Sequence, residues 1–209
     1  MDKRKIDLIL GLLDEHYGAE PVCYLDYSTP WQLLFATILS AQCTDARVNI
    51  VTKELFLKYP TLEGFANADI VDVERLVFST GFYKAKAQNL INSANILIDK
   101  FKGEMPKEIE NLLLLPGVGR KTANVVRGHI FNMPCIVVDT HVKRISNKLG
   151  LTKNNDPEKI EIDLMRILPK KNWIRYNTQS IAHGRKICKS PKPRCKECFL
   201  YDHCIGKID

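Results

Sequence analysis

Four cysteines near the end of the chain have a spacing that suits metal binding. The chain contains seven cysteines, an odd number for a secreted disulfide framework. The four that cluster are Cys188, Cys195, Cys198 and Cys204, and the scattered ones, expected to be small buried side chains, are Cys23, Cys43 and Cys135. Zinc ribbons use two tight Cys-x-x-Cys pairs, whereas this run contains one. Four thiolates also suit a cubane iron–sulfur cluster, so the spacing alone leaves the two metals equally open.

A glycine-rich turn lies between two helical patterns in the middle of the sequence. Residues 115–119 read LPGVG, in which Pro116 ends one pattern and Gly117 and Gly119 permit a tight turn before a helix at 121–131. Such a turn exposes backbone N–H groups at a helix N-terminus, where they bind phosphate without reading base sequence. For the two glycines alone, an ordinary turn between helices is the alternative.

Lys121 and Asp139 are the residues that could perform covalent chemistry. An amine must lose its proton before it attacks carbon, and both the helix dipole and the neighbouring Arg120 favour the neutral form of Lys121. A phosphate contact is the alternative role for this lysine. Asp139 is expected to be the N-cap of the next helix, and its carboxylate could also stabilise developing positive charge.

Helical spacing of apolar residues predominates along the chain. Apolar side chains recur every three or four positions from 82 to 101, which predicts an amphipathic helix. Residues 31–39 are apolar nearly all round and follow Thr29 and Pro30, which predicts a buried central helix. Further helix starts are expected at Asp69, Asp139 and Asp156. Only residues 135–138 resemble a strand, so the pattern predicts an all-α fold.

The composition predicts a soluble, basic protein. With 209 residues, of which 45% are hydrophobic, the chain can bury an ordinary core. No apolar stretch approaches the length of a membrane span, and the first residues lack the apolar run of a signal peptide. We therefore expect a cytoplasmic protein, associated with the nucleoid if it is bacterial. A net charge of +7 and a pI near 9.0 favour a polyanionic partner such as nucleic acid.

Residues 115–124, LPGVGRKTAN, closely resemble the helix-hairpin-helix motif of the endonuclease III family of DNA glycosylases. Residues 40–45 (SAQCTD), residues 138–141 (VDTH) and the four-cysteine tail match the same family in order and approximate separation, so the resemblance covers essentially the whole chain. It implies a six-helix domain, expected at 19–132, and a helical iron–sulfur cluster domain formed by 1–18 and 133–209. The family holds DNA in the cleft between them.

The resemblance implies a bifunctional DNA glycosylase and AP lyase of base excision repair that acts as a monomer on damaged double-stranded DNA. Lys121 matches the lysine that attacks the sugar C1′, expels an oxidised or ring-damaged pyrimidine and forms a Schiff base, after which β-elimination cleaves the strand 3′ to the abasic site. Asp139 matches the aspartate that assists this lysine. The four clustered cysteines match the ligands of one 4Fe-4S cluster per chain, which we expect to be structural because the sugar chemistry contains no redox step.

The remaining expected site residues contact DNA. Gln42 is expected to fill the space that an extruded nucleotide leaves, and Ser40 and Asp45 to line the base pocket. Phe82 is the expected wedge against the opposite strand, although the family commonly carries an aliphatic residue there, and core packing is its alternative role. The other expected contacts are Leu115, Gly117, Val118, Gly119 and Arg120 in the hairpin, His141 and Arg144 after Asp139, and Lys189, Lys192 and Arg194 between the first two cysteines.

Two other functions would use part of this pattern. A monofunctional adenine or mismatch glycosylase shares the hairpin, the aspartate and the cluster, but lacks a lysine at the position of Lys121. A non-enzymatic helix-hairpin-helix module with a structural zinc ion would bind DNA through the same turn. That module explains the charge and the hairpin, but it leaves Gln42, Lys121 and Asp139 without roles.

Overall fold

A computed structural model describes residues 2–208, which contain helices and loops but no strand. The predicted all-α fold is confirmed. Residues 135–138 have irregular backbone, since no second strand in the described part of the chain offers them a pairing partner. The chain divides into two compact units, the hairpin unit, Cys23–Met133, and the cysteine unit, Met1–Val22 with Pro134–Asp209. The domain bounds expected from the sequence differ from these by a few residues and stay a prediction.

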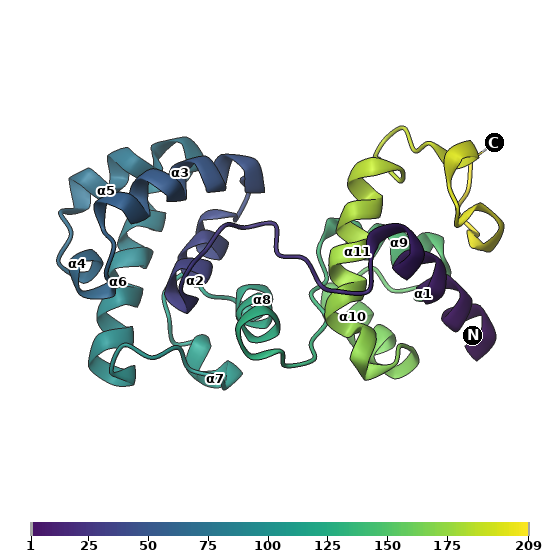
Figure 1. Cartoon of the computed structure of the whole chain (residues 1–209), viewed down its shortest axis with the longest axis horizontal. Helices are drawn as coiled ribbons and strands as arrows, with labels where there is room; N and C mark the ends of the chain where they lie inside the picture. Colours follow the sequence, from purple (N-terminus) through teal and green to yellow (C-terminus); the bar gives the residue numbers. More distant parts are fainter. Residues whose placement is uncertain (1, 209) are drawn as a thin grey trace. The chain divides into compact units, whose positions relative to one another are not determined.

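The hairpin unit is built around a central buried helix. Its helices are α2 (Pro30–Leu39), α3 (Asp45–Lys58), α4 (Leu62–Ala66), α5 (Ile70–Val77), the 3-10 helix η1 (Phe78–Thr80), α6 (Tyr83–Phe101), α7 (Ile109–Leu112) and α8 (Arg120–Phe131). Every residue of α2 after Pro30 is buried, as its apolar sequence predicts, and α2 packs against α3, α6 and α8 (Figure 1). The aromatic rings of Phe35 and Phe65, with centroids 4.9 Å apart, lie in this core.

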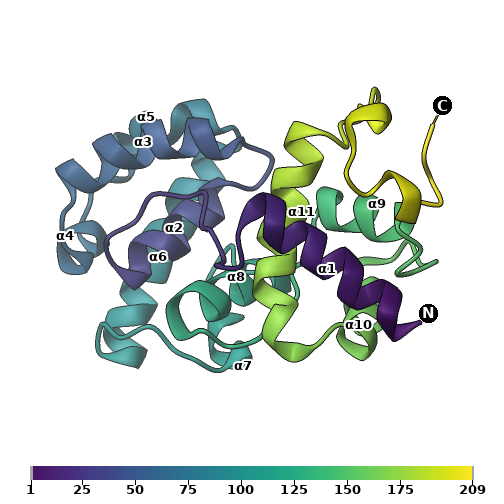
Figure 2. The ribbon, with the colours of Figure 1, turned by 45° about the vertical axis from the view of Figure 1, so that its right-hand side comes forward.

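The cysteine unit packs its N-terminal helix against its last long helix. Its helices are α1 (Lys3–Tyr17), α9 (Thr140–Lys148), α10 (Pro157–Ile167), α11 (Trp173–Lys186) and the 3-10 helices η2 (Lys170–Asn172), η3 (Cys195–Glu197) and η4 (Tyr201–His203). Figure 2 shows α1 against α11. Asp14 of α1 accepts hydrogen bonds from Arg175 at 2.9 Å and from Gln179 at 2.8 Å, both on α11. These polar contacts fix the register of the two helices at the edge of an apolar core.

None of the described helices combines the length and the apolar composition that crossing a membrane requires.

Candidate functional site

The glycine turn joins α7 to α8 and is held in place by buried side chains. Leu115 and Val118 are 2% and 8% exposed, so they anchor the turn in the core, and any contact they make with DNA is through backbone atoms. The hydroxyl of Ser93 donates a hydrogen bond to the carbonyl oxygen of Pro116 at 3.1 Å, which ties the turn to α6. The N-cap residue of α8, Gly119, forms no side-chain cap hydrogen bond, and the N-terminus of a helix is a favourable place for a phosphate oxygen.

Gly117 and Gly119 have different conformational requirements. Gly117 has φ +78°, and a Cβ atom there would lie 2.8 Å from Nδ2 of Asn89 and 3.2 Å from Ile38. Gly119 has φ −96°, and no atom lies within 4 Å of the position where its Cβ would be built. Position 117 therefore requires glycine for its backbone conformation, whereas position 119 can accommodate the methyl group of alanine in the folded protein.

We expect Gly117→Ala to lower the free energy of unfolding by about 1–2 kcal/mol, because an L residue is strained in the left-handed region. The free energy of unfolding of Gly119→Ala should differ from that of the original chain by no more than about 0.5 kcal/mol, because the substitution is exposed and unstrained. Urea denaturation of the two variants measures the difference. Equal stability of the two variants would show that Gly117 does not have a positive φ in the turn.

The structure places the two candidate catalytic residues at two helix N-termini. Lys121 is the second residue of α8 and its side chain is exposed, directly after the glycine turn. Asp139 is the N-cap of α9, where its Oδ1 accepts a hydrogen bond from the backbone N–H of Val142 at 2.7 Å. The capping role expected for Asp139 is confirmed. Because this bond uses Oδ1 alone, the carboxylate keeps acceptor capacity for a second task.

Gln42 and Phe82 share an unusual backbone conformation. Both are exposed, and both have positive φ, +56° for Gln42 and +49° for Phe82. Phe82 is 68% exposed, so packing in the core does not explain its aromatic ring. Residues other than glycine rarely adopt this conformation, and such strain is concentrated at functional sites. The structure thus presents both side chains to solvent on strained turns.

Ser40 and Asp45 have local structural partners. The Ser40 hydroxyl donates to the carbonyl oxygen of Thr37 at 2.8 Å, at the C-terminus of α2. Asp45 is the first residue of α3, after the N-cap Thr44, where a carboxylate stabilises the helix dipole. These contacts position the 40–45 segment, and a role of either side chain in a base pocket stays a prediction.

Arg144 joins α9 to the first cysteine of the tail. Its guanidinium donates to the carbonyl oxygen of Cys188 from Nη2 at 2.8 Å and from Nε at 3.2 Å. The same Nη2 lies 3.1 Å from Nδ1 of His141. A Cβ atom on Gly184 of α11 would meet these two side chains, at 2.2 Å from Nδ1 of His141. Arg144 is thus a brace within the cysteine unit, and Gly184 makes room for it.

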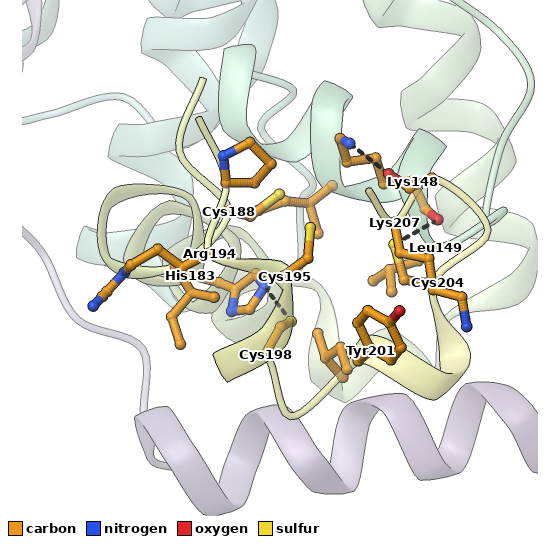
Figure 3. A pocket seen from close by; sticks show the side chains of 15 residues that line it. Lys148, Leu149, His183, Cys188, Arg194, Cys195, Cys198, Tyr201, Cys204 and Lys207 are labelled. Atoms are coloured by element: carbon orange, nitrogen blue, oxygen red, sulfur yellow. Dashed lines mark hydrogen bonds between the residues drawn. The ribbon is translucent and has the colours of Figure 1, made fainter. Parts of the chain in front are cut away.

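The four clustered cysteines line one cavity (Figure 3). The cavity is partly open to solvent. Cys188 follows α11, Cys195 is the first residue of η3, Cys198 lies between η3 and η4, and Cys204 follows η4. Among residues 2–208, no set of three or more His, Cys, Asp or Glu side chains forms a recognisable site for a single metal ion. The carbonyl oxygen of Lys148 lies 3.3 Å from the Cys204 Sγ and holds that end of the tail against α9.

The thiols of this cavity affect one another electrostatically. Burial raises the pKa of Cys198 and of Cys204 above the usual thiol value, and the charges of the neighbouring cysteines raise it further. Thiolates gathered in this way need a cationic group to remain ionised. The donor set therefore fits an iron–sulfur cluster, which supplies that charge and has the size to reach four separate sulfurs.

His183 is a neighbour of the cavity that the sequence alone did not reveal. It is 2% exposed, and its Nε2 lies 3.5 Å from Sγ of Cys198, while its Nδ1 lies 3.0 Å from the Tyr17 hydroxyl. Burial, followed by the charges of Arg144 and His16, lowers the pKa of His183 to about 4, so the ring is neutral at pH 7. A neutral ring has one N–H, which can be donated to the sulfur while Tyr17 donates to the other nitrogen.

The basic loop between Cys188 and Cys195 presents lysines to solvent. Lys189 and Lys192 are exposed. Arg194 is also exposed, but its guanidinium forms an ion pair with Glu197 at 3.0 Å and donates to the carbonyl oxygen of Lys186 at 2.5 Å. The two lysines are therefore freer than Arg194 to reach a phosphate.

The helical fold of residues 2–208, the glycine turn before an exposed lysine and the four-cysteine cavity agree with a helix-hairpin-helix protein of the DNA glycosylase class. Residues 35–170 match the HhH-GPD superfamily of base excision DNA repair proteins. Endonuclease III of Synechocystis sp. is 48% identical over 97% of this chain and 92% of that protein. Solved structures of a non-covalent endonuclease III–DNA complex and of a trapped covalent endonuclease III–DNA intermediate each match with a TM-score of 0.92 and 40% identity over 99% of this chain. They are covered over 96% and 97% of their own lengths.

This chain belongs to the HhH-GPD superfamily and, within it, to the endonuclease III family. The family resemblance predicted from the sequence is confirmed, as are the predicted fold and the enzyme class, a DNA glycosylase with AP lyase activity.

Proposed function

We propose that the chain removes oxidised or ring-damaged pyrimidines from duplex DNA, with Lys121 as the nucleophile and Asp139 as its assisting carboxylate. The observation that carries the proposal is the position of Lys121, exposed in the first turn of α8 directly after the glycine turn. Phosphates bound by the first-turn N–H groups would bring the sugar of the same strand to this lysine. The trapped covalent intermediate of a 40% identical relative supports an enzyme–DNA bond in the reaction.

The chemistry of the proposal needs no external reactant except water. The neutral amine of Lys121 attacks C1′, the C1′–N bond breaks, and the base leaves with the electron pair and takes up a proton. Opening of the sugar ring gives a Schiff base between Nζ and C1′. Loss of a proton from C2′ then expels the 3′ phosphate, with its electron pair, and cleaves the strand. Hydrolysis of the Schiff base regenerates the lysine.

Asp139 acts on the same sugar in this proposal. Positive charge develops on C1′ and the ring oxygen as the base departs, and a nearby carboxylate lowers the energy of that state. The carboxylate can also accept the proton that Lys121 must lose. Its Oδ1 is held by the N–H of Val142, so the orientation of the group is fixed before DNA binds.

Gln42 and Phe82 give the enzyme access to the base. Extruding a nucleotide from a duplex costs a few kcal/mol, and side chains that occupy the vacated space offset part of that cost. Both residues are exposed on strained turns of the hairpin unit, which suits insertion into a base stack. We infer that Gln42 fills the gap and that Phe82 separates bases on the opposite strand.

Release of thymine glycol from a duplex tests the proposed substrate class. We expect the free base and a 3′-cleaved strand from the damaged duplex and neither from an undamaged duplex of the same sequence. Release of adenine from a mismatch without strand cleavage would instead support a monofunctional enzyme. From the family we also infer that the enzyme acts as a monomer in the cytoplasm, associated with the nucleoid if the protein is bacterial.

The four clustered cysteines are proposed to hold one 4Fe-4S cluster per chain. Bound there, the cluster would brace the loop that carries Lys189 and Lys192 and keep their positive charges at the DNA backbone. Two findings support this assignment over a single zinc ion: the chain belongs to the endonuclease III family, and among residues 2–208 no three ligand side chains are grouped around the position of one metal ion.

Iron and sulfide analysis of the purified protein tests this assignment. We expect about four iron atoms and four sulfides per chain, and loss of most of the iron in Cys195→Ala. Cys23→Ala is the matched control, since Cys23 lies in the hairpin unit, and it should keep the full content. One zinc ion per chain without sulfide would overturn the cluster assignment.

A further inference from the structure

Lys86 is a buried cation to which the reaction described above gives no role. It lies in the first turn of α6, and its side chain is 5% exposed. Lysine is almost never fully buried unless its charge is paired, because removing an ammonium group from water is costly. Among residues 2–208, its hydrogen-bond partners are backbone carbonyl oxygens and not a carboxylate.

The number of acceptors around Lys86 matches the number of protons on an ammonium group. Its Nζ donates to the carbonyl oxygens of Leu39 at 2.9 Å, Ala41 at 2.9 Å and Thr80 at 2.8 Å. Burial lowers the pKa of Lys86, but a neutral amine has only two N–H groups and would leave one carbonyl without a donor. The three contacts therefore need the protonated form, in which each bond is assisted by charge.

These three carbonyls lie at the end of α2, at the end of η1 and in the turn after α2, close in sequence to the two residues proposed to enter the base stack. Leu39 and Ala41 lie three positions and one position before Gln42, and Thr80 lies two positions before Phe82. Gln42 and Phe82 both have left-handed backbone conformations, which persist only where surrounding contacts over-determine them. The ammonium group of Lys86 supplies such contacts from beneath both turns at once.

We infer that Lys86 is a positioning residue that joins the turn carrying Gln42 to the turn carrying Phe82 and fixes the spacing of the two side chains that enter the base stack. The inference rests on the proposed function, in which Gln42 and Phe82 act during extrusion of the nucleotide. Lys86 touches neither DNA nor the reacting atoms in this scheme. It acts through the two turns.

Lys86→Met tests the inference, because methionine keeps the apolar stem and removes the three hydrogen bonds. We expect excision of thymine glycol from a fully paired duplex to fall about a hundredfold, the loss typical of a misplaced binding group. The loss should be much smaller when the opposite nucleotide lacks its base, because the wedge then has no pair to separate. Amide hydrogens of residues 39–43 and 80–83 should exchange faster.

Lys84→Met, an exposed change on the same helix, should match the original protein in all three measurements.

A double variant, Gln42→Ala with Phe82→Ala, separates failure of this inference from failure of the proposed function. If the double variant excises normally, these side chains have no role in extrusion and the proposed function is wrong on that point. If the double variant is impaired but Lys86→Met is not, only the Lys86 inference is overturned. The Lys86 inference is also overturned if Lys86→Met lowers the excision rate by the same factor in the original protein and in the double variant. Should Lys86→Met fail to fold, Lys86→Gln, which keeps two N–H donors, replaces it in the same comparisons.

Discussion

Lys121→Gln is expected to lose strand cleavage at an abasic site by about a thousandfold or more, as removal of an enzyme nucleophile does. Glutamine has nearly the length of lysine but cannot form a Schiff base, so β-elimination has no covalent intermediate from which to proceed. The turn before it is held by Leu115, Val118 and Ser93, and it should keep its phosphate contacts. Binding to a damaged duplex should therefore weaken by no more than the loss of one phosphate contact.

Lys53→Gln is the matched control for this variant. Lys53 is an exposed lysine on α3 of the same unit, and the substitution removes the same charge. We expect it to cleave at the original rate, with affinities for both variants measured at one salt concentration because phosphate contacts depend on salt. Full cleavage by Lys121→Gln would remove Lys121 from the mechanism.

Asp139→Asn is expected to slow base excision by about 10²- to 10³-fold, the range found when a group that stabilises transition-state charge is removed. The substitution isolates the charge from the cap, since asparagine caps a helix about as well as aspartate does. The hydrogen bond from the Val142 N–H to the side-chain oxygen should survive, and the thermal midpoint should stay unchanged. Cleavage of a preformed abasic site should be reduced less, because no base has to depart.

Asp139→Ala supplies the comparison for the cap. It removes both the charge and the hydrogen bond to α9, so it should also lower the free energy of unfolding by about 1 kcal/mol. Equal losses by Asp139→Asn on the damaged base and on the abasic site would assign Asp139 a general structural role instead.

Local signals in the sequence predicted several of the helices. The apolar run after Thr29 and Pro30 predicted α2, and the N-caps Asp69, Asp139 and Asp156 predicted the starts of three more helices, all of which the structure contains. These predictions succeed because capping and apolar periodicity depend on neighbours within one or two turns. The strand-like segment 135–138 is not a strand because strand formation needs a partner, which a local pattern cannot reveal.

Site residues could be predicted where they are close together in the sequence, within one motif. They could not be predicted where the fold brings together residues that are far apart in the sequence. Lys121, the glycine turn and the four cysteines could be selected from the sequence because their spacing is local. Lys86 and His183 could not, since their partners lie up to 47 and 166 residues away along the chain. One signal was available for Lys86. It occupies a position of the amphipathic 82–101 segment that proves to be buried, where a lysine is out of place unless it has partners.

Some expected DNA contacts have other partners in the structure. Leu115 and Val118 are buried in the core, and the guanidinium of Arg144 is bonded to the carbonyl oxygen of Cys188. A sequence shows that such residues lie in a motif, but it does not show whether a side chain points into the protein or out of it. The contacts of these three residues with DNA stay predictions, and those of Leu115 and Val118 would use backbone atoms, whereas the side chains of the exposed lysines of the cysteine loop and of the exposed Phe82 can reach DNA.

Borohydride trapping on a duplex with a single thymine glycol tests the central claim most directly, because reduction converts a Schiff base into a stable protein–DNA adduct. We predict an adduct with the original chain and with Lys53→Gln, none with Lys121→Gln, and a modified peptide that contains Lys121 after digestion of the adduct. An adduct that persists in Lys121→Gln, or that maps to another amine, would contradict the account. Base release without any adduct would show that the chain is a monofunctional glycosylase.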